Sequence, residues 1–398
     1  MRVLLISHTC QSPTEGQPRV RWLAKQPGLE LCVLIPNQWR HYGCWRGATI
    51  AEDVRSFCRV EPVAFPWVGP AQFYLHWYPR LASLLKSFRP DVIDLWEEPW
   101  GLVSAQAVRL RNKLLPATRI ISETEQNICK QLPFPFEQFR RYTLKHADFA
   151  VARSHEAAEV LRSKGYAGEV EVVPNGVDVE LFRPMNRSEC RSAIGAMGFQ
   201  VGYVGRLVEE KGLSDLVESL KWCDPSVQLL FVGAGPAKPA LETQAARQGC
   251  AGRARFLENR PLEQLPEVMN GLDCLVLPSR TTDRWKEQFG RVLIEAGACG
   301  IPVIGSDSGA IPDVVGDAGL VAPERNPREL AAAIEKLRVD ADLRTRMGKA
   351  GLRQAVEQYS WQRVAARMEE IYRRVSKAEG SESAASEISV PIGAETGA

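Results

Sequence analysis

Short runs of apolar, often β-branched residues alternate with longer segments of helical periodicity along almost the whole chain. Parallel strands joined by helices produce this alternation, because each βαβ unit returns the chain to the same edge of a sheet. The expected strands span residues 3–6, 31–35, 92–95, 119–122 and 149–152, then 201–204, 228–232, 274–277 and 303–305. The expected helices span residues 78–87, 102–113, 156–164, 213–220 and 292–298. The pattern therefore predicts an α/β fold with parallel sheets.

Two domains are expected because the 398 residues exceed what one hydrophobic core usually holds, about 250 residues. The boundary is expected at the sequence VPNGVD, where Pro174, Asn175 and Gly176 follow a strand and favour a turn. We therefore expect an N-terminal domain at residues 1–174 and a C-terminal domain at residues 175–359.

The end of the chain divides into a periodic and an aperiodic segment. Val364, Met368 and Ile371 recur at helical spacing and predict an amphipathic helix at residues 360–375, which we expect to fold back onto the first domain. Residues 376–398 are rich in Ser, Glu, Ala and Gly without periodicity, so we expect a disordered tail.

The composition and charge of the chain limit the classes of partner and the cellular compartment that we expect. A formal net charge of +2 gives no bulk attraction to nucleic acid, so no nucleic-acid partner is expected. No apolar stretch approaches the length that a membrane span needs, about 20 residues, and the apolar run at the N-terminus is too short for a signal peptide. Ten cysteines without a CxxC pair disfavour zinc and indicate reduced thiols. We expect a cytoplasmic protein.

The stretch PSRTTDRWKEQFGRVLIEAGACGIPVIGSDSGAIPDVV has the order strand end, loop, helix, strand, loop. Glu287 lies in its first loop and Glu295 in its helix, which begins near Gly290 and Arg291. The free amides and the dipole of a helix start favour a diphosphate, and ionised carboxylates accept hydrogen bonds from sugar hydroxyls. Taken alone, two glutamates at this spacing are better explained as solvated or ion-paired carboxylates, and it is the flanking Gly, Phe and strand context that favours a site.

A second cationic motif, YVGRLVEEKG, follows another expected strand. The strand ends at Gly205, and Arg206 and Lys211 come next, near a helix start. Two fixed cations at the carboxyl end of a strand can neutralise a leaving diphosphate without a metal. The alternative is a surface ladder with Glu209 and Glu210.

These motifs together resemble the retaining GT-B glycosyltransferases of family 4, also called group 1. The matching pieces are VPNGVD, GRLVEEKG, FVGAGP, PSR followed by EQFGRVLIE, and GSDSGAIPDVV, in the order of the family. The resemblance implies two facing Rossmann-like domains with an interdomain cleft. It also implies transfer of a sugar from a nucleotide-diphosphate sugar to an acceptor hydroxyl, with retained anomeric configuration, no bound metal and no further cofactor.

The resemblance assigns roles on the donor side. Arg206 and Lys211 would bind the donor diphosphate, Glu287 the sugar hydroxyls and Glu295 the ribose hydroxyls. The remaining donor-side positions are Gly205 and the backbone amides of Phe289, Gly290 and Arg291. The one DxD string, Asp340-Ala341-Asp342, falls between helical segments and is interpreted as a helix cap and not as a metal site.

The first domain departs from the family. Many relatives carry a Gly-Gly loop after the first strand, whereas the loop HTCQSPTEGQPR has the single Gly16. Relatives also often place a His after the strand near residue 122, where SETEQNI offers Glu123 or Gln126 as substitutes on the acceptor side. His8 has no identifiable partner in the sequence and is interpreted as a loop residue.

Two aromatic features of the first half leave alternatives open. Seven of the ten Trp lie in the first 100 residues. They either pack in the core and loops or form an acceptor site in which aromatic rings stack on sugars. The segment FPFEQFRRYTLKHADF mixes aromatic and basic residues. It is either a peripheral contact with the inner face of a membrane or a buried helix with a basic outer face.

Glycan, lipid-linked and small-molecule acceptors all fit these observations, and polysaccharide or glycolipid assembly is the working hypothesis. A sugar-nucleotide epimerase of the same fold and a non-catalytic nucleotide- or glycan-binding module are the alternatives. A dehydrogenase is disfavoured, because FVGAGP lacks the third glycine of a dinucleotide fingerprint and has Lys238 there.

Overall fold

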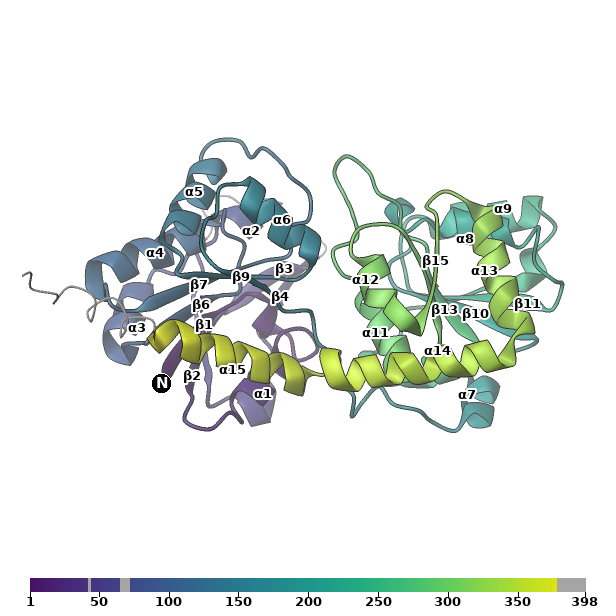
Figure 1. Cartoon of the computed structure of the whole chain (residues 1–398), viewed down its shortest axis with the longest axis horizontal. Coiled ribbons are helices and arrows are strands. Elements are labelled where there is room, and N and C mark those ends of the chain that lie inside the picture. The colour runs from purple at the N-terminus through teal and green to yellow at the C-terminus, as the bar shows by residue number, and fades with distance from the viewer. Residues whose placement is uncertain (42–43, 65–71, 378–398) are drawn as a thin grey trace, which may run out of the picture.

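The computed structural model describes residues 1–41, 44–64 and 72–377 and contains two parallel sheets side by side (Figure 1). The first sheet has seven strands in the order β5-β2-β1-β6-β7-β8-β9. Their bounds are β1 (Arg2–Ile6), β2 (Glu30–Pro36), β5 (Cys58–Glu61), β6 (Val92–Leu95), β7 (Arg119–Thr124), β8 (Phe149–Ala152) and β9 (Val170–Val172). A separate two-stranded antiparallel sheet pairs β3 (Gln38–His41) with β4 (Cys44–Gly47).

The second sheet has six parallel strands in the order β12-β11-β10-β13-β14-β15. Their bounds are β10 (Phe199–Val204), β11 (Val227–Val232), β12 (Ala254–Leu257), β13 (Cys274–Leu277), β14 (Val303–Ser306) and β15 (Gly319–Ala322). In both sheets the strand order reverses at the centre, between β1 and β6 and between β10 and β13. Such a reversal opens a crevice beyond the carboxyl ends of the strands, where ligands of α/β proteins bind.

Helices cover both faces of the first sheet. Helices α1 (Gln17–Leu23) and α15 (Trp361–Lys377) pack on one face with β1 and β2, whereas α3 (Leu81–Phe88) and α4 (Leu102–Leu114) pack on the other. The remaining helices of this half are α2 (Gln72–Leu75), α5 (Phe136–His146) and α6 (His155–Ser163). The apolar side chains of β1 alternate between the two cores, with Val3 in one and Leu4 in the other.

One large core holds the second half together around β10, β11, β13 and β14. Its helices are α7 (Arg187–Ala193), α8 (Leu213–Ser219), α9 (Lys238–Arg247), α10 (Leu265–Asn270), α11 (Arg291–Ala298), α12 (Ile311–Val315), α13 (Pro327–Val339) and α14 (Ala341–Gln354). Asp340 caps α14 by accepting a hydrogen bond from the Leu343 amide at 2.7 Å, which confirms the interpretation of the DxD string as a helix cap.

Short 3-10 helices and one π-helical turn complete the described elements. They are η1 (Thr9–Gln11), η2 (Glu52–Val54), η3 (Glu209–Lys211), η4 (Ala251–Arg253), η5 (Leu262–Gln264), η6 (Gly316–Ala318) and the π-helical η7 (Ala355–Tyr359).

The chain crosses between the two halves twice, and the two crossings lie side by side. The Val177 amide donates to the Tyr359 carbonyl at 2.7 Å, and the Trp361 amide donates to the Val177 carbonyl at 3.2 Å. A side chain at Gly176 would collide with the Trp361 ring, at 2.3 Å, so the glycine lets that ring close over the crossing. Helices α14 and α15 follow one another along the lower edge of Figure 1.

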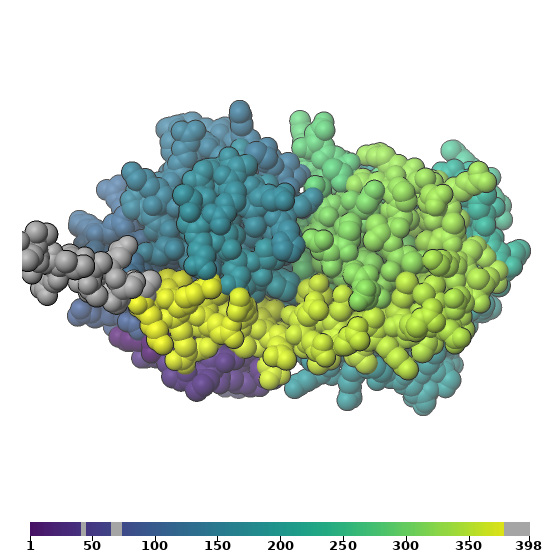
Figure 2. Space-filling model, in the orientation of Figure 1, coloured from purple at the N-terminus to yellow at the C-terminus, as the bar shows by residue number. Residues whose placement is uncertain are grey.

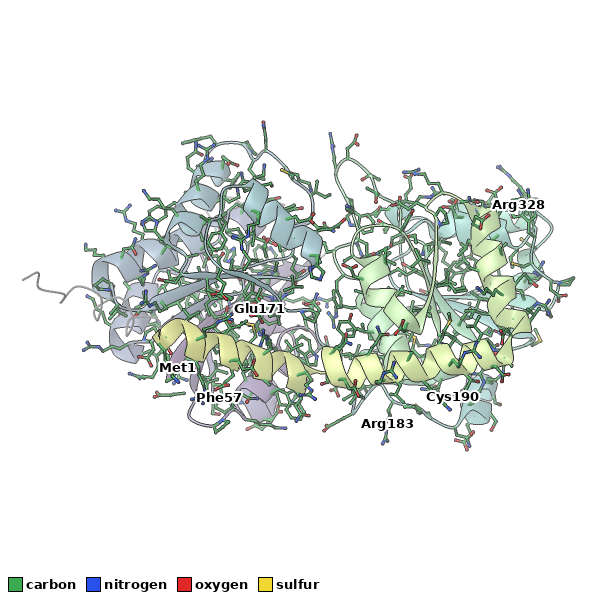
Figure 3. All side chains as sticks on the ribbon, viewed as in Figure 1. Met1, Phe57, Glu171, Arg183, Cys190 and Arg328 are labelled. Carbon is green, nitrogen blue, oxygen red and sulfur yellow. The ribbon has the colours of Figure 1, made fainter. Side chains whose placement is uncertain are left out.

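Helix α15 returns the end of the chain to the first half. Val364, Met368 and Ile371 are buried there against the first sheet, and Arg374 pairs with Glu171 of β9 at 2.8 Å. Figure 3 labels Glu171 beside this helix. The helix includes residues 376 and 377, which the sequence assigned to the tail, because the last turn continues to Lys377. The rest of the expected tail, residues 378–398, lies outside the described residues.

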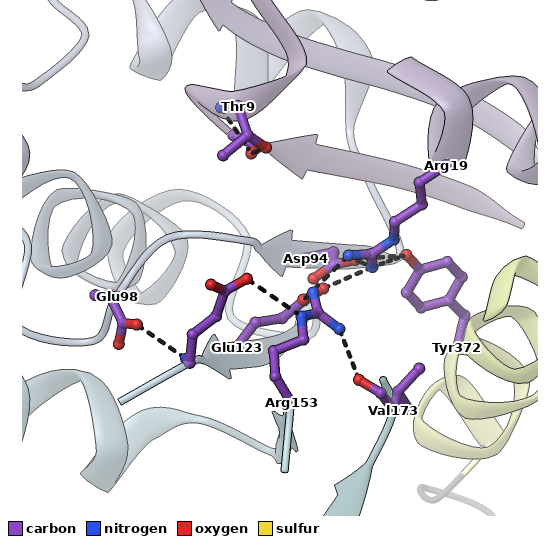
Figure 4. Close-up of polar contacts among 10 residues, drawn as sticks. Thr9, Arg19, Asp94, Glu98, Glu123, Arg153, Val173 and Tyr372 are labelled. Carbon is purple, nitrogen blue, oxygen red and sulfur yellow. Dashed lines mark hydrogen bonds and ion pairs between the residues drawn. The ribbon is translucent and has the colours of Figure 1, made fainter. Parts of the chain in front are cut away.

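A fully buried charge cluster, formed by Arg19, Asp94, Glu123, Arg153 and Tyr372, joins α15 to the first sheet (Figure 4). Arg19 donates to Asp94 at 2.8 Å and to Glu123 at 2.6 Å, and the Tyr372 hydroxyl donates to Asp94 at 2.5 Å. Arg153 is hydrogen-bonded to Glu123. Burial raises the pKa of Asp94 well above its usual range, whereas the two arginines outweigh burial and hold the pKa of Glu123 low.

The tryptophans of the first half differ in their burial. Trp39, Trp96 and Trp100 are buried, Trp45 and Trp77 are more than a third exposed, and Trp67 lies outside the described residues. Over the described part of the chain, no helix is both long and apolar enough to cross a bilayer.

Candidate active site

A cleft of ≈ 540 Å³ lies between the two halves at the carboxyl ends of the central strands. Figure 2 shows the blue first half and the green second half in contact across this boundary. All eight donor-side positions expected from the sequence line it: Gly205, Arg206, Lys211, Glu287, Phe289, Gly290, Arg291 and Glu295. The first half and the crossing contribute Thr14, Glu15, Glu125 and Asn175.

The start of α11 forms one wall of the cleft. Gly290 caps the helix with a φ of 84°, and a β-carbon there would lie 2.9 Å from Leu277, so this turn requires glycine. The first amides of a helix have no partner inside it and face outward from its positive end. The Nε atom of Arg291 is buried and lacks a hydrogen-bond partner among the described residues. An anion such as a phosphate would satisfy these donors.

The cationic motif meets the glutamate loop in the same cleft. Lys211 lies 2.5 Å from a carboxylate oxygen of Glu287, and the Ser279 hydroxyl donates to the same oxygen at 2.7 Å. The Lys211 ammonium also lies 4.9 Å from the centre of the Trp285 ring. Arg206 is exposed at the cleft. Lys211 therefore pairs with Glu287 and does not form the surface ladder with Glu209 and Glu210 that was the alternative from sequence.

Glu295 faces the cleft from the first turns of α11. Among the described residues no hydrogen bond to its carboxylate is found, and it lines the cleft, so its oxygens are available to a ligand. Burial raises the pKa of Glu295, and the nearby Arg291 opposes that rise. A carboxylate in this position can accept hydrogen bonds from the hydroxyls of a polyol.

The glycines of FVGAGP pack closely against the backbone of the cationic motif that begins at Gly205. Gly233 has a φ of 145°, and a β-carbon there would lie 2.0 Å from the Gly205 carbonyl. The Leu207 amide donates to the Ala234 carbonyl at 2.9 Å. The motif therefore brings two loops into contact, which explains its glycines without a dinucleotide fingerprint.

Three contacts join the loop around Glu287 to the first half. The Asn127 side chain donates to the Glu287 carbonyl at 2.8 Å, Lys130 donates to the Arg284 carbonyl at 2.8 Å, and Lys286 lies 2.5 Å from Glu156. The partners are separated by 130 to 160 residues, so no local pattern indicates them. Part of the cleft wall contributed by the second half is thus held by the first half.

The acceptor-side residues expected from sequence do not line the cleft. Gly16 is buried, and its missing side chain makes room for Cys10, 2.7 Å from a β-carbon position. Glu123 belongs to the buried charge cluster. Gln126 turns back on its own loop and accepts the Ile128 amide at 3.1 Å. From the first half, the cleft is lined instead by Thr14, Glu15 and Glu125.

His8, interpreted from sequence as a loop residue without a partner, is held by Glu97. Its amide donates to Glu97 at 2.6 Å, and its ring nitrogen Nδ1 lies 2.8 Å from the same carboxylate. The ring stacks on buried Trp39 at 4.5 Å, and buried His76 lies 3.7 Å from Glu97. The interpretation missed this pair because its members are 89 residues apart.

Comparison with known proteins accounts for the architecture of the cleft. Residues 189–354 match the family model "Glycosyl transferases group 1", and residues 27–181 match "Glycosyltransferase Family 4". A GDP-mannose-dependent alpha-(1-6)-phosphatidylinositol monomannoside mannosyltransferase of Mycobacterium tuberculosis is 30% identical over 350 residues, 83% of this chain and 87% of the relative. The chain belongs to glycosyltransferase family 4. This family 4 glycosyltransferase is therefore an enzyme of the hexosyltransferase type.

Other relatives and solved structures agree with this assignment. A D-inositol 3-phosphate glycosyltransferase of Corynebacterium jeikeium is 28% identical over 351 residues, 83% of the family 4 chain described here and 77% of the relative. Sucrose-phosphate synthase from Thermosynechococcus elongatus has a TM-score of 0.72 at 21% identity, over 95% of this chain and all of the other. HepE from Anabaena, in complex with UDP and glucose, has a TM-score of 0.68 at 19% identity, over 94% of this chain and 100% of the other. The fold is GT-B.

Proposed function

We propose that this enzyme moves a hexosyl unit from a nucleotide-diphosphate sugar to an acceptor hydroxyl, with retained anomeric configuration. The observation that carries the proposal is the single cleft that gathers two cations, a helix start and two carboxylates from separate motifs. That set matches the three parts of such a donor: a diphosphate, a ribose and a sugar.

The diphosphate would lie between the start of α11 and the side chains of Arg206 and Lys211. In the reaction the bond from C1 of the sugar to the diphosphate breaks, and its electron pair leaves with the phosphate oxygen. The acceptor oxygen forms the new bond to C1 on the face from which the diphosphate leaves, and its proton passes to the departing phosphate oxygen. Fixed cations and amides in a preorganised site stabilise the charge that develops on the leaving group. These groups supply that charge without a metal ion or further cofactor.

The sugar and ribose would be recognised by the carboxylates. Glu287 is held by Lys211 and Ser279 through one oxygen, which leaves its other oxygen for sugar hydroxyls. Glu295 would accept the ribose hydroxyls. Binding of a diphosphate beside Lys211 would share that ammonium between phosphate and Glu287, and so couple recognition of the two parts of the donor.

The acceptor would enter from the first half, past Thr14, Glu15 and Glu125. These cleft-lining groups are hydroxyl and carboxylate, which favours a polyhydroxylated acceptor. The relatives named above are described as acting with inositol 3-phosphate or phosphatidylinositol monomannoside. A glycan, a lipid-linked sugar or a small polyol is the proposed acceptor class, in polysaccharide or glycolipid assembly on the cytoplasmic side of a membrane.

A thermal-shift screen against UDP-, GDP-, ADP- and dTDP-sugars, with and without EDTA, tests the donor assignment. A donor that binds the folded state raises its melting temperature. We expect a rise with one nucleotide that survives EDTA and is lost in Arg206→Ala. Donor-sugar conversion without acceptor would favour an epimerase, and the absence of any shift would contradict the proposed function.

A further inference from the structure

The backbone carbonyl of Glu287 is held from both halves of the molecule. From the first half, the buried Asn127 side chain donates to this oxygen at 2.8 Å. From the second half, the Ala310 amide donates to it at 3.2 Å. Gly309 makes this approach possible, because a β-carbon there would lie 2.1 Å from the same oxygen. The backbone of a cleft-lining residue is thus fixed in part by a side chain of the opposite half.

Glu156 joins Asn127 to the same loop a second time. One of its carboxylate oxygens accepts a hydrogen bond from Asn127 at 3.2 Å, and the other lies 2.5 Å from the Lys286 ammonium. Asn127 follows β7, and Glu156 lies in the first turn of α6, which faces the second half in Figure 1. Both neighbours of the Asn127 amide group are acceptors, so its nitrogen faces them. Asn127 and Glu156 therefore form a bridge to two consecutive residues, Lys286 and Glu287.

We propose that Asn127 is a positioning residue for the donor sugar that acts through Glu287, so that contact between the two halves completes the sugar site. The inference rests on the proposed function, in which the Glu287 carboxylate accepts hydrogen bonds from sugar hydroxyls. That carboxylate is held within the second half by Lys211 and Ser279. Asn127 fixes the backbone end of the same residue, and Glu287 has its full set of contacts when the first half is in place.

The bridge also orients the peptide unit that follows Glu287. The N–H of a trans peptide points opposite to its C=O, so the Gln288 amide points away from Asn127. Gln288 lines the cleft, and α11 begins three residues further on, at Arg291. Loss of the bridge would free this peptide unit to rotate, while the helix start and Arg206 keep their own supports. The contribution of the sugar to binding should therefore depend on Asn127, whereas the contribution of the diphosphate should not.

Calorimetric titration separates these two contributions. The full-length protein is titrated with UDP-glucose, GDP-mannose, ADP-glucose and dTDP-glucose, each beside its nucleoside diphosphate. We expect Asn127→Ala to bind the sugar nucleotide about 10-fold more weakly than wild type and to bind the nucleoside diphosphate equally well. Asn112→Ala is the matched control, because the Asn112 side chain, on α4, makes a long contact of 3.4 Å to Tyr142. This variant should bind both ligands as wild type does.

Lys286 supplies a second test that does not require Asn127→Ala to fold. Lys286→Ala removes the ion pair with Glu156 and should weaken sugar-nucleotide binding about threefold, again without an effect on the nucleoside diphosphate. Lys286→Arg keeps a cation opposite Glu156 and should restore the wild-type affinity. A local disturbance of the loop by the loss of any lysine would not be rescued in this way.

Three results would overturn the proposal. Equal ratios of the two affinities in wild type, Asn127→Ala and Lys286→Ala would remove the role of the bridge and leave the proposed function standing. Equal weakening of sugar nucleotide and nucleoside diphosphate in Asn127→Ala would show a general structural role in its place. A wild-type protein that binds no sugar nucleotide would overturn the proposed function, and the role of Asn127 with it.

Discussion

At the scale of single residues, the charge of the cleft is set by a few side chains that share partners. Lys211 is both the ion-pair partner of Glu287 and one of the two cations proposed for the diphosphate. Replacing Lys211 would therefore remove both the ion pair and the phosphate contact. Arg206, in the proposed mechanism, contacts the phosphate alone.

Replacing either cation should slow transfer strongly. We expect Arg206→Ala and Lys211→Ala each to lower kcat by about 10²-fold, the usual loss when one preorganised charge stabiliser is removed. Lys211→Ala should also raise the donor KM, because Glu287 loses its partner. Steady-state rates are compared with those of Lys221→Ala, whose ion pair with Glu218 lies at the surface. Near-normal kcat in both variants would contradict the assigned roles.

Glu98 should make stability depend on pH. Burial raises its pKa from 4.5 to about 8, although the Thr124 hydroxyl and the Glu125 amide favour its charged form. The folded state therefore holds a proton that the unfolded state releases, and stability should fall as pH rises from about 4.5 to about 8. In Glu98→Gln this fall should be reduced by up to about 3 kcal/mol, as measured by urea unfolding at pH 5 and pH 8.5. Exposed Glu263→Gln is the control, and identical pH slopes in both variants would refute the assignment.

The cleft-lining positions of the second half could be predicted from sequence because each belongs to a short contiguous motif whose local geometry determines its position. Gly290 and Arg291 define a helix start, and Arg206 follows a strand. The cleft-lining positions of the first half could not be predicted in the same way. Glu123 looks like a cleft residue until Arg19 and Arg153, which are distant in sequence, are seen to enclose it.

At the scale of elements, α5 presents an exposed aromatic and basic edge. Phe134, just before the helix, has an exposed fraction of 81%, and the Arg141 side chain is exposed, whereas Arg140 is buried and pairs with Glu137. One face of the helix is therefore buried, as one of the two interpretations from sequence expected, whereas the segment just before the helix is exposed to solvent. Aromatic side chains beside cations favour the interface of an anionic membrane.

Membrane contact would therefore depend on this edge. We expect sedimentation with vesicles containing anionic phosphatidylglycerol, and a several-fold loss of bound protein in the double variant Phe134→Ser, Arg141→Ser. Vesicles of neutral phosphatidylcholine are the control, and Met197→Ser, an exposed apolar residue on the second half, is the matched variant. Equal sedimentation of all three proteins would contradict the peripheral contact.

Among the strands, the central ones were predicted almost to the residue and the edge strands were missed. Strands β6, β8 and β13 have the expected bounds, because buried parallel strands are continuous apolar runs. Strands β9 and β15 are only partly buried and carry mixed sequences, so hydrophobicity alone does not distinguish them from loops.

At the scale of the whole molecule, α15 makes the last segment of the chain part of the first half. Its Tyr372 hydroxyl completes the buried charge cluster by donating to Asp94. A buried polar group that loses its partner costs more than the bond contributes when formed, so the attachment of this helix depends on that hydroxyl. We propose residues 1–174 with α15, and residues 175–359, as the two domains.

Tyr372→Phe should loosen this attachment. The loss of one hydrogen bond to buried Asp94 should lower the free energy of unfolding by about 1–3 kcal/mol, measured by urea denaturation. Tyr142→Phe is the control, because the Tyr142 hydroxyl makes only a long contact of 3.4 Å to Asn112. Equal stability of the two variants would show that the hydroxyl contributes nothing to the attachment.

The double crossing at Val177 and Tyr359 limits how the two halves can move. A single connecting segment would permit rotation about three axes, but two adjacent segments joined by hydrogen bonds resist torsion and leave mainly one rotational degree of freedom. Opening along that coordinate separates the Thr14 and Glu15 wall from the Arg206 wall without sliding one past the other. Each catalytic cycle can therefore release its product and return the two walls to the same mutual register.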